Sequence, residues 1–466
     1  MIGSETRVPG LEPTAVILCG LALTSIVLPD DGAVSVFTVA AVGAGISLGL
    51  ATAIEARAGI RSLIRVDILI LWVLYGLTFS EFLFPQPNLD ALVSPAAAVN
   101  GTDAVLIGFA GLAVGRHLVR NLGGSYELST FSDVRPTHIF LLFVLAALLG
   151  YLHVFLAVNF DPFEAVRQMS LPRFAQSWSR GRYGDAYALL FEVGALIFLI
   201  PPVAGLIYAR SNEYTLLQKL IVTIVLVFTF YFGFTSGTRS VLVTYVITFG
   251  GAYFLATRQI TLRKVLILSV PMLVLLFFAS IYMLEFRKIG LSNFSFAESN
   301  DTFFVDYNVV NISHLLEKFP DQFEFLGFEI PFNALIRPIP RVLWPGKPEG
   351  LSVSIETALA AGPGVTIACT FVGEAYMAGG LLAVLFISLV FGMAAELWNR
   401  VGSNSNGQFA QLLYVSGFLC ATIAMRSILS MVPFMLPTLA LWIFGKLWLP
   451  RWSIPRAPPA FHPDKR

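Results

Sequence analysis

The chain has 466 residues, of which 56% are hydrophobic and only 13% are charged, and its mean hydropathy is +0.76. Soluble globular domains carry roughly 25% charged and about 45–50% apolar residues. The composition therefore excludes a water-soluble enzyme, a disordered chain and a disulfide-stapled secreted domain, and it indicates a protein that crosses the lipid bilayer several times. The net charge of +1, without a basic run, argues against a nucleic-acid partner.

Cysteine usage points to neither a disulfide framework nor a metal site. Cys19, Cys369 and Cys420 lie far apart and form no CxxC pair. We therefore expect no resident metal and no cofactor.

Runs of about 20 mostly apolar residues, the length that crosses a bilayer as a helix, recur along the whole chain. We predict twelve spans, at 14–29, 32–54, 65–84, 96–115, 137–158, 186–209, 220–235, 240–257, 265–284, 370–395, 409–425 and 428–448. The first is followed by Leu28-Pro29-Asp30-Asp31 without a small-residue cleavage site, so we expect it to remain as an anchor. The fold class is therefore all-α, with residues 1–466 forming one integral membrane domain.

Two of these apolar stretches, 220–257 and 412–449, are too long for one straight span. Each carries one arginine near its middle: Arg239, which follows Thr235-Ser236-Gly237-Thr238, and Arg426. A charged side chain at the bilayer centre costs roughly 3 kcal/mol or more. We therefore predict that each stretch folds as a helical hairpin with its arginine at the tip.

Lysine and arginine in the short loops set the expected orientation, because cytoplasmic loops are enriched in both. Basic loops alternate correctly along the chain if both termini are cytoplasmic. Two long connections, 159–185 and 285–369, then lie outside, and the second separates spans nine and ten as a large extracytoplasmic loop. Asp67 and Glu396 fall near cytoplasmic span ends, where we expect them to be solvated.

The predicted outer side carries more cations than this rule allows. They are Arg167, Arg173, Arg180 and Arg182 in the first long connection, Arg239 and Arg426 at the hairpin tips, and Arg337, Arg341 and Lys347 in the large loop. Such cations could pair with lipid headgroups or with local acids such as Asp161 and Glu164. Because the cations outnumber those acids, and because arginine suits two-pronged binding of phosphate, the set favours a phosphorylated lipid substrate.

The large loop contains three recognisable segments. Apolar positions recur at helical spacing over 301–319, which predicts an amphipathic helix, and a short helix is predicted over 352–361. Between them, four prolines in residues 337–348 exclude a helix and predict a stiff, extended strip. That strip would hold its cations for phosphate and Trp344 for stacking on a sugar ring.

Glu374 lies just inside the outer end of the following span, in Gly373-Glu374-Ala375-Tyr376. An ionisable residue there is a functional candidate, either as a general base or as the ion-pair partner of an outer arginine. His314 is a second candidate base, and we expect His153 to be a hydrogen-bonded helix residue.

Together these segments resemble a known family. Arg337-Pro-Ile-Pro-Arg341, continuing to Trp344-Pro-Gly-Lys347-Pro348, followed by Gly373-Glu374-Ala375-Tyr376, is similar to bacterial O-antigen and capsule repeat-unit polymerases, as is an arginine just after Ser236-Gly237-Thr238. The similarity covers about residues 230–430. It implies a C-type glycosyltransferase that joins undecaprenyl-pyrophosphate-linked oligosaccharides at the outer face of the bacterial inner membrane, with a chain-length regulator as a further partner.

By this resemblance Arg239, Arg337, Arg341, Lys347 and Glu374 are candidates, with Glu374, Arg239 and Arg341 as the catalytic set and Arg337 and Lys347 binding substrate. We add Trp344, for the stacking described above, and Tyr376 to the substrate-binding set. Arg426, Arg180 and Arg182 join the binding set on the charge argument alone. Pyrophosphate leaves readily once preorganised cations hold its charge, so we expect no obligatory metal.

Three alternatives remain open on the sequence. One is an O-antigen ligase, which needs the same leaving-group site. Another is a C-type enzyme that uses a polyprenyl-monophosphate sugar, with Asp30 and Asp31 as its acids. A lipid-glycan flippase or transporter would predict related halves, and no repeat links 1–235 to 236–466.

Overall fold

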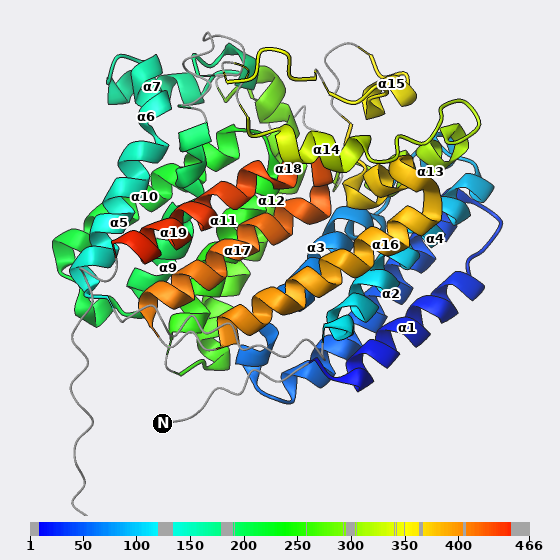
Figure 1. The fold of residues 1–466 in the computed structure, drawn as a ribbon, viewed down its shortest axis with the longest axis horizontal. Coiled ribbons are helices and arrows are strands. Elements are labelled where there is room, and N and C mark those ends of the chain that lie inside the picture. Colours follow the sequence, from blue (N-terminus) through cyan, green and yellow to red (C-terminus); the bar gives the residue numbers. More distant parts are fainter. Residues whose placement is uncertain are drawn as a thin grey trace, which may run out of the picture.

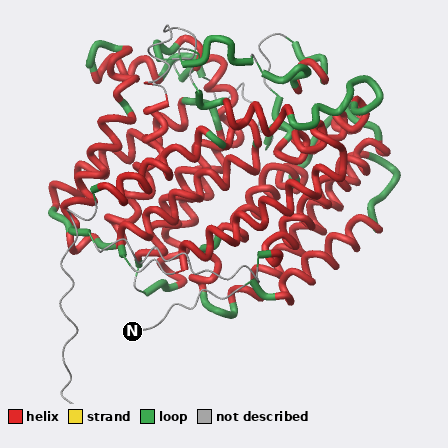
Figure 2. Tube along the Cα trace, in the orientation of Figure 1, coloured by secondary structure: helices red, strands yellow, loops and turns green. Residues whose placement is uncertain are grey.

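The computed structural model describes residues 9–119, 134–178, 190, 192–257, 259–291, 293–294, 303, 305–339, 341, 343–348, 350–362, 367–403 and 407–448. Within these ranges the chain is helical and contains no strand, as Figure 2 shows. The predicted all-α class is therefore confirmed.

The main helices follow one another along the chain with short turns between most of them. They are α1 (Leu11–Ile26), α2 (Ala33–Ala56), α3 (Val66–Thr78), α4 (Pro95–Leu118), α5 (Pro136–Gly150), α6 (Leu152–Ala157), α7 (Pro162–Met169), α9 (Ile200–Ala209), α10 (Leu216–Thr235), α11 (Arg239–Ala256), α12 (Leu262–Ile289), α13 (Asn308–Lys318), α14 (Glu329–Ile336), α15 (Ile355–Ala358), α16 (Thr370–Ser403), α17 (Gln408–Arg426), α18 (Ile428–Met431) and α19 (Leu436–Leu447).

Among the described residues, nine helical segments are long and apolar enough to cross a membrane, which identifies a membrane protein. Three shorter apolar helices, Leu11–Ile26, Val66–Thr78 and Gly194–Ala209, coincide with the remaining predicted spans. Both predicted hairpins form: α10 packs against α11, which begins at Arg239, and α17, which ends at Arg426, packs against α18 and α19.

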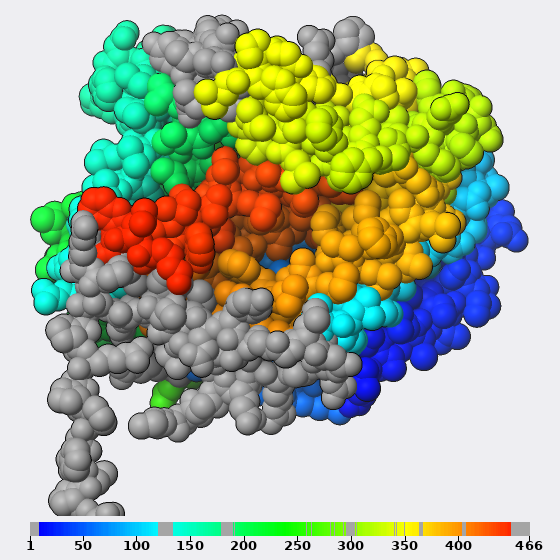
Figure 3. Space-filling model, viewed as in Figure 1, coloured from blue at the N-terminus to red at the C-terminus, as the bar shows by residue number. Residues whose placement is uncertain are grey.

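The long helices run roughly side by side, and short elements gather at one end of them (Figure 1). We call this the loop end; it carries α7, α13, α14, α15 and α18. On the face seen in Figure 3, described residues of the connection from α12 to α16 (green to yellow) cover the middle and right of the loop end, and α7 is visible at the left. Since α12 continues to Ile289, this connection begins at 290, later than the predicted 285.

Two segments of that connection differ from their predicted form. The amphipathic helix begins only at Asn308, because Asp306 and Tyr307 have left-handed backbone angles (φ 69° and 47°) that end helical continuity. The proline-rich strip is folded back instead of extended: Lys347 Nζ donates to the main-chain oxygens of Arg337 and Ile339, 2.9 Å away in both cases. Ten extended residues would reach about 33 Å.

The helix pair α4 and α16 forms the tightest part of the core. Gly111 and Gly115 of α4 let α16 approach closely. A side chain at Gly115 would collide with the main chain of Leu389, and one at Gly111 would collide with the Cβ atom of Ser388. Small residues permit such close contact between membrane helices. On the same helix, Gly101 accommodates Ser313 of α13, which fixes the start of the large connection on the bundle.

A buried ionic network closes the opposite end of the bundle. Asp67 accepts hydrogen bonds from Arg65 at 2.6 and 3.0 Å, from Arg116 at 3.1 Å and from Asn399 at 2.6 Å. The network continues to Glu55, Glu396 and Arg400. The expectation that Asp67 and Glu396 are solvated is wrong: they are 1% and 4% exposed, because helices distant in sequence pack over them.

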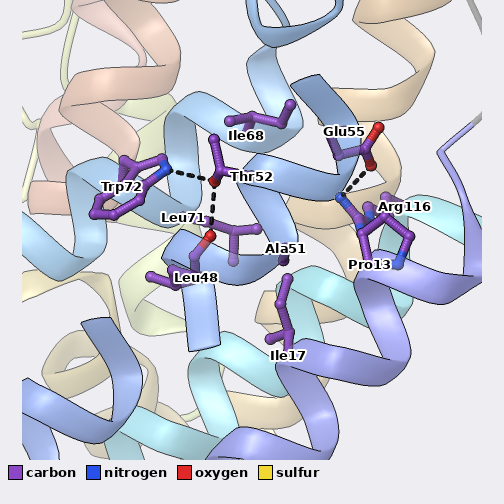
Figure 4. A pocket seen from close by; sticks show the side chains of 10 residues that line it. All are labelled: Pro13, Ile17, Leu48, Ala51, Thr52, Glu55, Ile68, Leu71, Trp72 and Arg116. Atoms are coloured by element: carbon purple, nitrogen blue, oxygen red, sulfur yellow. Dashed lines mark hydrogen bonds and ion pairs between the residues drawn. The ribbon is translucent and has the colours of Figure 1, made fainter. Parts of the chain in front are cut away.

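The pocket in Figure 4 lies beside this network, between α1, α2, α3 and α4. Apolar side chains such as Ile17, Leu48 and Leu71 line it, and its charged groups, Glu55 and Arg116, already contact each other. It therefore lies within the structural core, next to the ionic network.

We predict that Asp67→Asn destabilises the protein strongly. The change leaves Arg65 and Arg116 buried with one carboxylate fewer, which typically costs about 3–5 kcal/mol. Thermal unfolding of the detergent-solubilised protein measures the effect. Glu12→Gln is the control, because the Glu12–Arg57 pair is 67% and 74% exposed and its loss should change stability by less than about 1 kcal/mol. Equal Tm values for the two variants would contradict the prediction.

Candidate functional site

The turn between α10 and α11 organises the loop end. Ser236 Oγ donates to the Gly233 oxygen at 2.7 Å and accepts from the Thr238 amide at 3.3 Å, which shapes the turn locally. Gly237 has φ +63°, and a side chain there would collide with Arg287 of α12. Only glycine meets both demands without strain. The turn is thus packed tightly against the end of α12.

Four arginines from four segments meet at this turn, and we call them the arginine cluster. Arg239 is the first residue of α11. Arg173 Nη1 donates to Thr238 Oγ1 at 3.0 Å, and Arg426 Nη1 donates to Ser240 Oγ at 2.8 Å. Arg287 lies against Gly237. Both Arg173 and Arg287 also lie over the ring of Phe174, at 6.0 and 5.6 Å from its centroid.

Cationic charge dominates this cluster. Asp306 and Glu81 attract Arg239, and Arg426 repels it. Asp306 likewise attracts Arg287, and Arg426 repels it. Among the described residues, the four guanidinium groups of the cluster face these two carboxyl groups. An anion with several oxygens would relieve the repulsion, and arginine is the side chain best suited to hold one.

Glu374 joins the cluster to α18. One carboxylate oxygen accepts from Ser427 Oγ at 2.6 Å, and the other accepts from the amides of Ile428 and of Leu429, the latter at 3.2 Å. A carboxylate that receives amides at a helix start fixes that helix. Because Ser427 directly follows Arg426, Glu374 positions the end of α17. These three donors occupy both oxygens, so the contacts describe a positioning residue, and its predicted role as a base stays untested.

The cations of the proline-rich strip form a second group beside α18. Arg337 Nη1 donates to the Leu429 oxygen at 3.3 Å. Arg341 donates to the main-chain oxygens of Lys347 and Pro348, at 3.1 and 3.4 Å. Burial and the charges of Arg341 and Arg337 lower the pKa of Lys347. Trp344 is 36% exposed in the same strip.

The predicted site residues therefore fall into two neighbouring groups. Arg239 and Arg426 meet directly, and Glu374 and Arg337 connect through residues 427–429. By contrast, Arg341, Lys347 and Trp344 are held within their own strip. Tyr376 donates to the Phe319 oxygen at 3.2 Å and so anchors the connection after α13. Arg180 and Arg182 lie outside the described residues.

The two candidate histidines, His314 and His153, make contacts within their own helices or turns. His314 Nδ1 lies 3.4 Å from Glu317 on α13, and His153 Nδ1 contacts the Gly150 oxygen at 2.9 Å, as expected for a helix residue. Asp30 and Asp31 are exposed between α1 and α2.

Two members of the site escaped sequence reasoning. Arg287 lies at the end of a long apolar stretch. It could have been identified by the argument used for Arg239, that a charged residue in an apolar stretch has a functional reason. Asp306 carries no local signal, because only the fold brings it to Arg239, 67 residues away in sequence.

Comparisons with protein-family models, with curated proteins and with solved structures found no match to this chain.

We predict that Glu374→Gln loosens α18. Its amide nitrogen cannot accept a hydrogen bond from Ser427, Ile428 or Leu429, so at least one buried donor loses its acceptor, at about 1–3 kcal/mol. Hydrogen exchange should become faster at residues 428–430 and change little elsewhere. Glu317→Gln is the matched control, because that carboxylate is 49% exposed on α13. Unchanged exchange in the α18 amides would show that Glu374 does not hold them.

Proposed function

We propose that this protein is a polymerase of undecaprenyl-pyrophosphate-linked oligosaccharide repeat units, of the O-antigen or capsule type. The observation that supports the proposal most directly is the arginine cluster. It lies where several apolar helices end, the level at which the pyrophosphate of a membrane-held lipid would lie. The family resemblance of residues 337–348 and 373–376 points to the same substrate class.

The proposed topology places twelve spans in the bacterial inner membrane, with both termini cytoplasmic and the loop end outside. Supporting it are the nine long apolar helices and the three shorter ones that coincide with the other predicted spans. In this orientation the balanced ionic network faces the cytoplasm, and the cation-rich end meets substrates outside.

In the proposed reaction one glycan leaves its lipid pyrophosphate and joins a hydroxyl of a second lipid-linked unit. Negative charge grows on the pyrophosphate as the glycosidic bond breaks. Arg239 and Arg426, fixed by Asp306 and Ser240 at 3.0 and 2.8 Å, would stabilise that charge without reorganising. Arg173 and Arg287 would complete the set, and Glu374 would keep Arg426 in place.

We predict that Arg239→Ala and Arg426→Ala each lower polymerisation about 100-fold or more, the loss seen when one preorganised donor to a developing charge is removed. The measurement is lipopolysaccharide or capsule banding after complementation of a deletion strain. The expected product is a single repeat unit on the acceptor in place of a ladder.

Arg167→Ala is the matched control, since Arg167 belongs to the same end, is 72% exposed and pairs only locally with Glu164 among its described ion pairs. It should leave the ladder unchanged. A bare acceptor without any repeat in the deletion strain would instead favour the ligase reaction. Full ladders in both cluster variants would refute the proposed site.

We also predict that transfer by the purified protein survives a strong chelator, because four guanidinium groups can neutralise a pyrophosphate. The measurement is polymer formation from isolated lipid-linked repeat units with and without EDTA. Complete loss of product that magnesium or manganese restores would contradict this expectation.

A further inference from the structure

Among the residues that the structure describes, the acid that forms an ion pair with the arginine cluster is Asp306. Its Oδ1 accepts from Arg239 Nη1 at 3.0 Å, and its charge also acts on Arg287. The two partners differ in exposure: the Arg239 side chain is 13% exposed and that of Asp306 is 36% exposed. Asp306 therefore presents a carboxylate that a second molecule can reach, directly beside the cations.

The backbone around Asp306 is held in an unfavourable conformation. Asp306 and Tyr307 are consecutive non-glycine residues in the left-handed region, with φ 69° and 47°. Such residues persist only where their surroundings determine them, and they concentrate at functional sites.

Several side chains enforce that conformation from outside the segment. Buried Glu81 accepts the Val305 amide at 2.6 Å, and Asn308 donates to the Leu77 and Val305 oxygens at 2.8 and 2.9 Å. The side-chain amide of Asn311 donates to the main-chain oxygen of Asp306 at 3.1 Å and to that of Ala368 at 2.8 Å. These contacts fix the backbone that carries Asp306 on both sides of the residue.

Glu374 offers a contrast. It is 3% exposed, and three donors engage its two oxygens. Glu81, which also acts on Arg239, is 0% exposed. Of these three carboxyl groups, the reachable one on a strained and well-held backbone is Asp306. We propose that Asp306 is a catalytic residue, the group that contacts the acceptor hydroxyl and removes its proton during glycosyl transfer. The proposal rests on the proposed function.

The step balances without another reactant. The acceptor oxygen forms a bond to the anomeric carbon of the donor, and the bond from that carbon to the pyrophosphate oxygen breaks. The bonding pair leaves with the undecaprenyl pyrophosphate, which the arginine cluster holds. The hydroxyl proton moves to the Asp306 carboxylate and passes from there to water after the product departs.

Donor binding would prepare this step. A pyrophosphate on the cluster competes for Arg239, so the Asp306 oxygen that accepts from Arg239 in the free protein becomes available to a hydroxyl. The same carboxylate thus serves as counter-ion before the donor arrives and as proton acceptor afterwards.

The left-handed backbone of Asp306 suggests two substitutions that test this role without adding strain. Asparagine and glycine both tolerate φ near +69°. Asp306→Asn keeps the shape and removes the proton acceptor; Asp306→Gly removes the side chain and leaves space for a small carboxylate. Asp321→Asn is the control, because it removes an exposed acid from the same connection.

Two quantities are measured on the full-length protein in detergent. One is polymer formation from isolated lipid-linked repeat units, and the other is the rise in Tm caused by undecaprenyl pyrophosphate, which reports binding. We expect both Asp306 variants to lose about 100-fold or more of the transfer rate. We expect their Tm shift to be at least as large as that of wild type, because the pyrophosphate no longer competes with a carboxylate for Arg239. Formate should restore transfer in Asp306→Gly and have no effect on Asp306→Asn or on the control.

The outcomes separate this inference from the proposed function. Transfer within twofold of wild type in either variant overturns the role of Asp306. A loss that formate does not restore, or a reduced Tm shift, also overturns it and makes Asp306 a positioning residue for Arg239. If undecaprenyl pyrophosphate shifts the Tm of Arg426→Ala as much as that of wild type, the proposed function fails instead.

Discussion

Mutual repulsion among guanidinium groups at one turn is the constraint on which the loop end depends. Arg173, Arg239, Arg287 and Arg426 come from four separate segments and meet around residues 237–240. Holding them together requires rigid supports: a glycine that admits Arg287, hydroxyl groups that orient Arg173 and Arg426, and Asp306 on Arg239. An arrangement that is unfavourable by itself becomes favourable when an anion binds, and this is the physical basis of the proposed activity.

At the opposite end of the molecule, carboxylates balance the charge of the clustered arginines. There Arg65, Arg116 and Arg400 meet Glu55, Asp67 and Glu396, so that three cations face three carboxylates. The ion pair between Arg116 and Asp67 is almost fully buried, with both side chains 1% exposed. Among the described residues, this charge-balanced network ties α2, α3, α4 and α16 together. Charge balance, more than the number of arginines, distinguishes the structural end from the candidate site.

Residues outside the arginine cluster hold the candidate site in place. Glu374 fixes α18 and the residue after Arg426. Glu81, which lies just beyond α3, fixes the segment that carries Asp306. The close packing of α4 with α16 and α13 gives the carboxyl groups of Glu374 and Glu81 a rigid base. Residues 9–119 therefore contribute to the site through Glu81.

The sequence by itself determined the all-helical membrane class, the two arginine-tipped hairpins and the excess of cations near them. These follow from composition and from the cost of burying charge, which act locally along the chain. Only the tertiary structure decided which cations meet, because Arg287 and Asp306 reach Arg239 through helix packing and not through spacing in sequence. It also decided that the proline-rich strip folds back, since prolines exclude a helix but leave the direction of the chain to the contacts of Lys347.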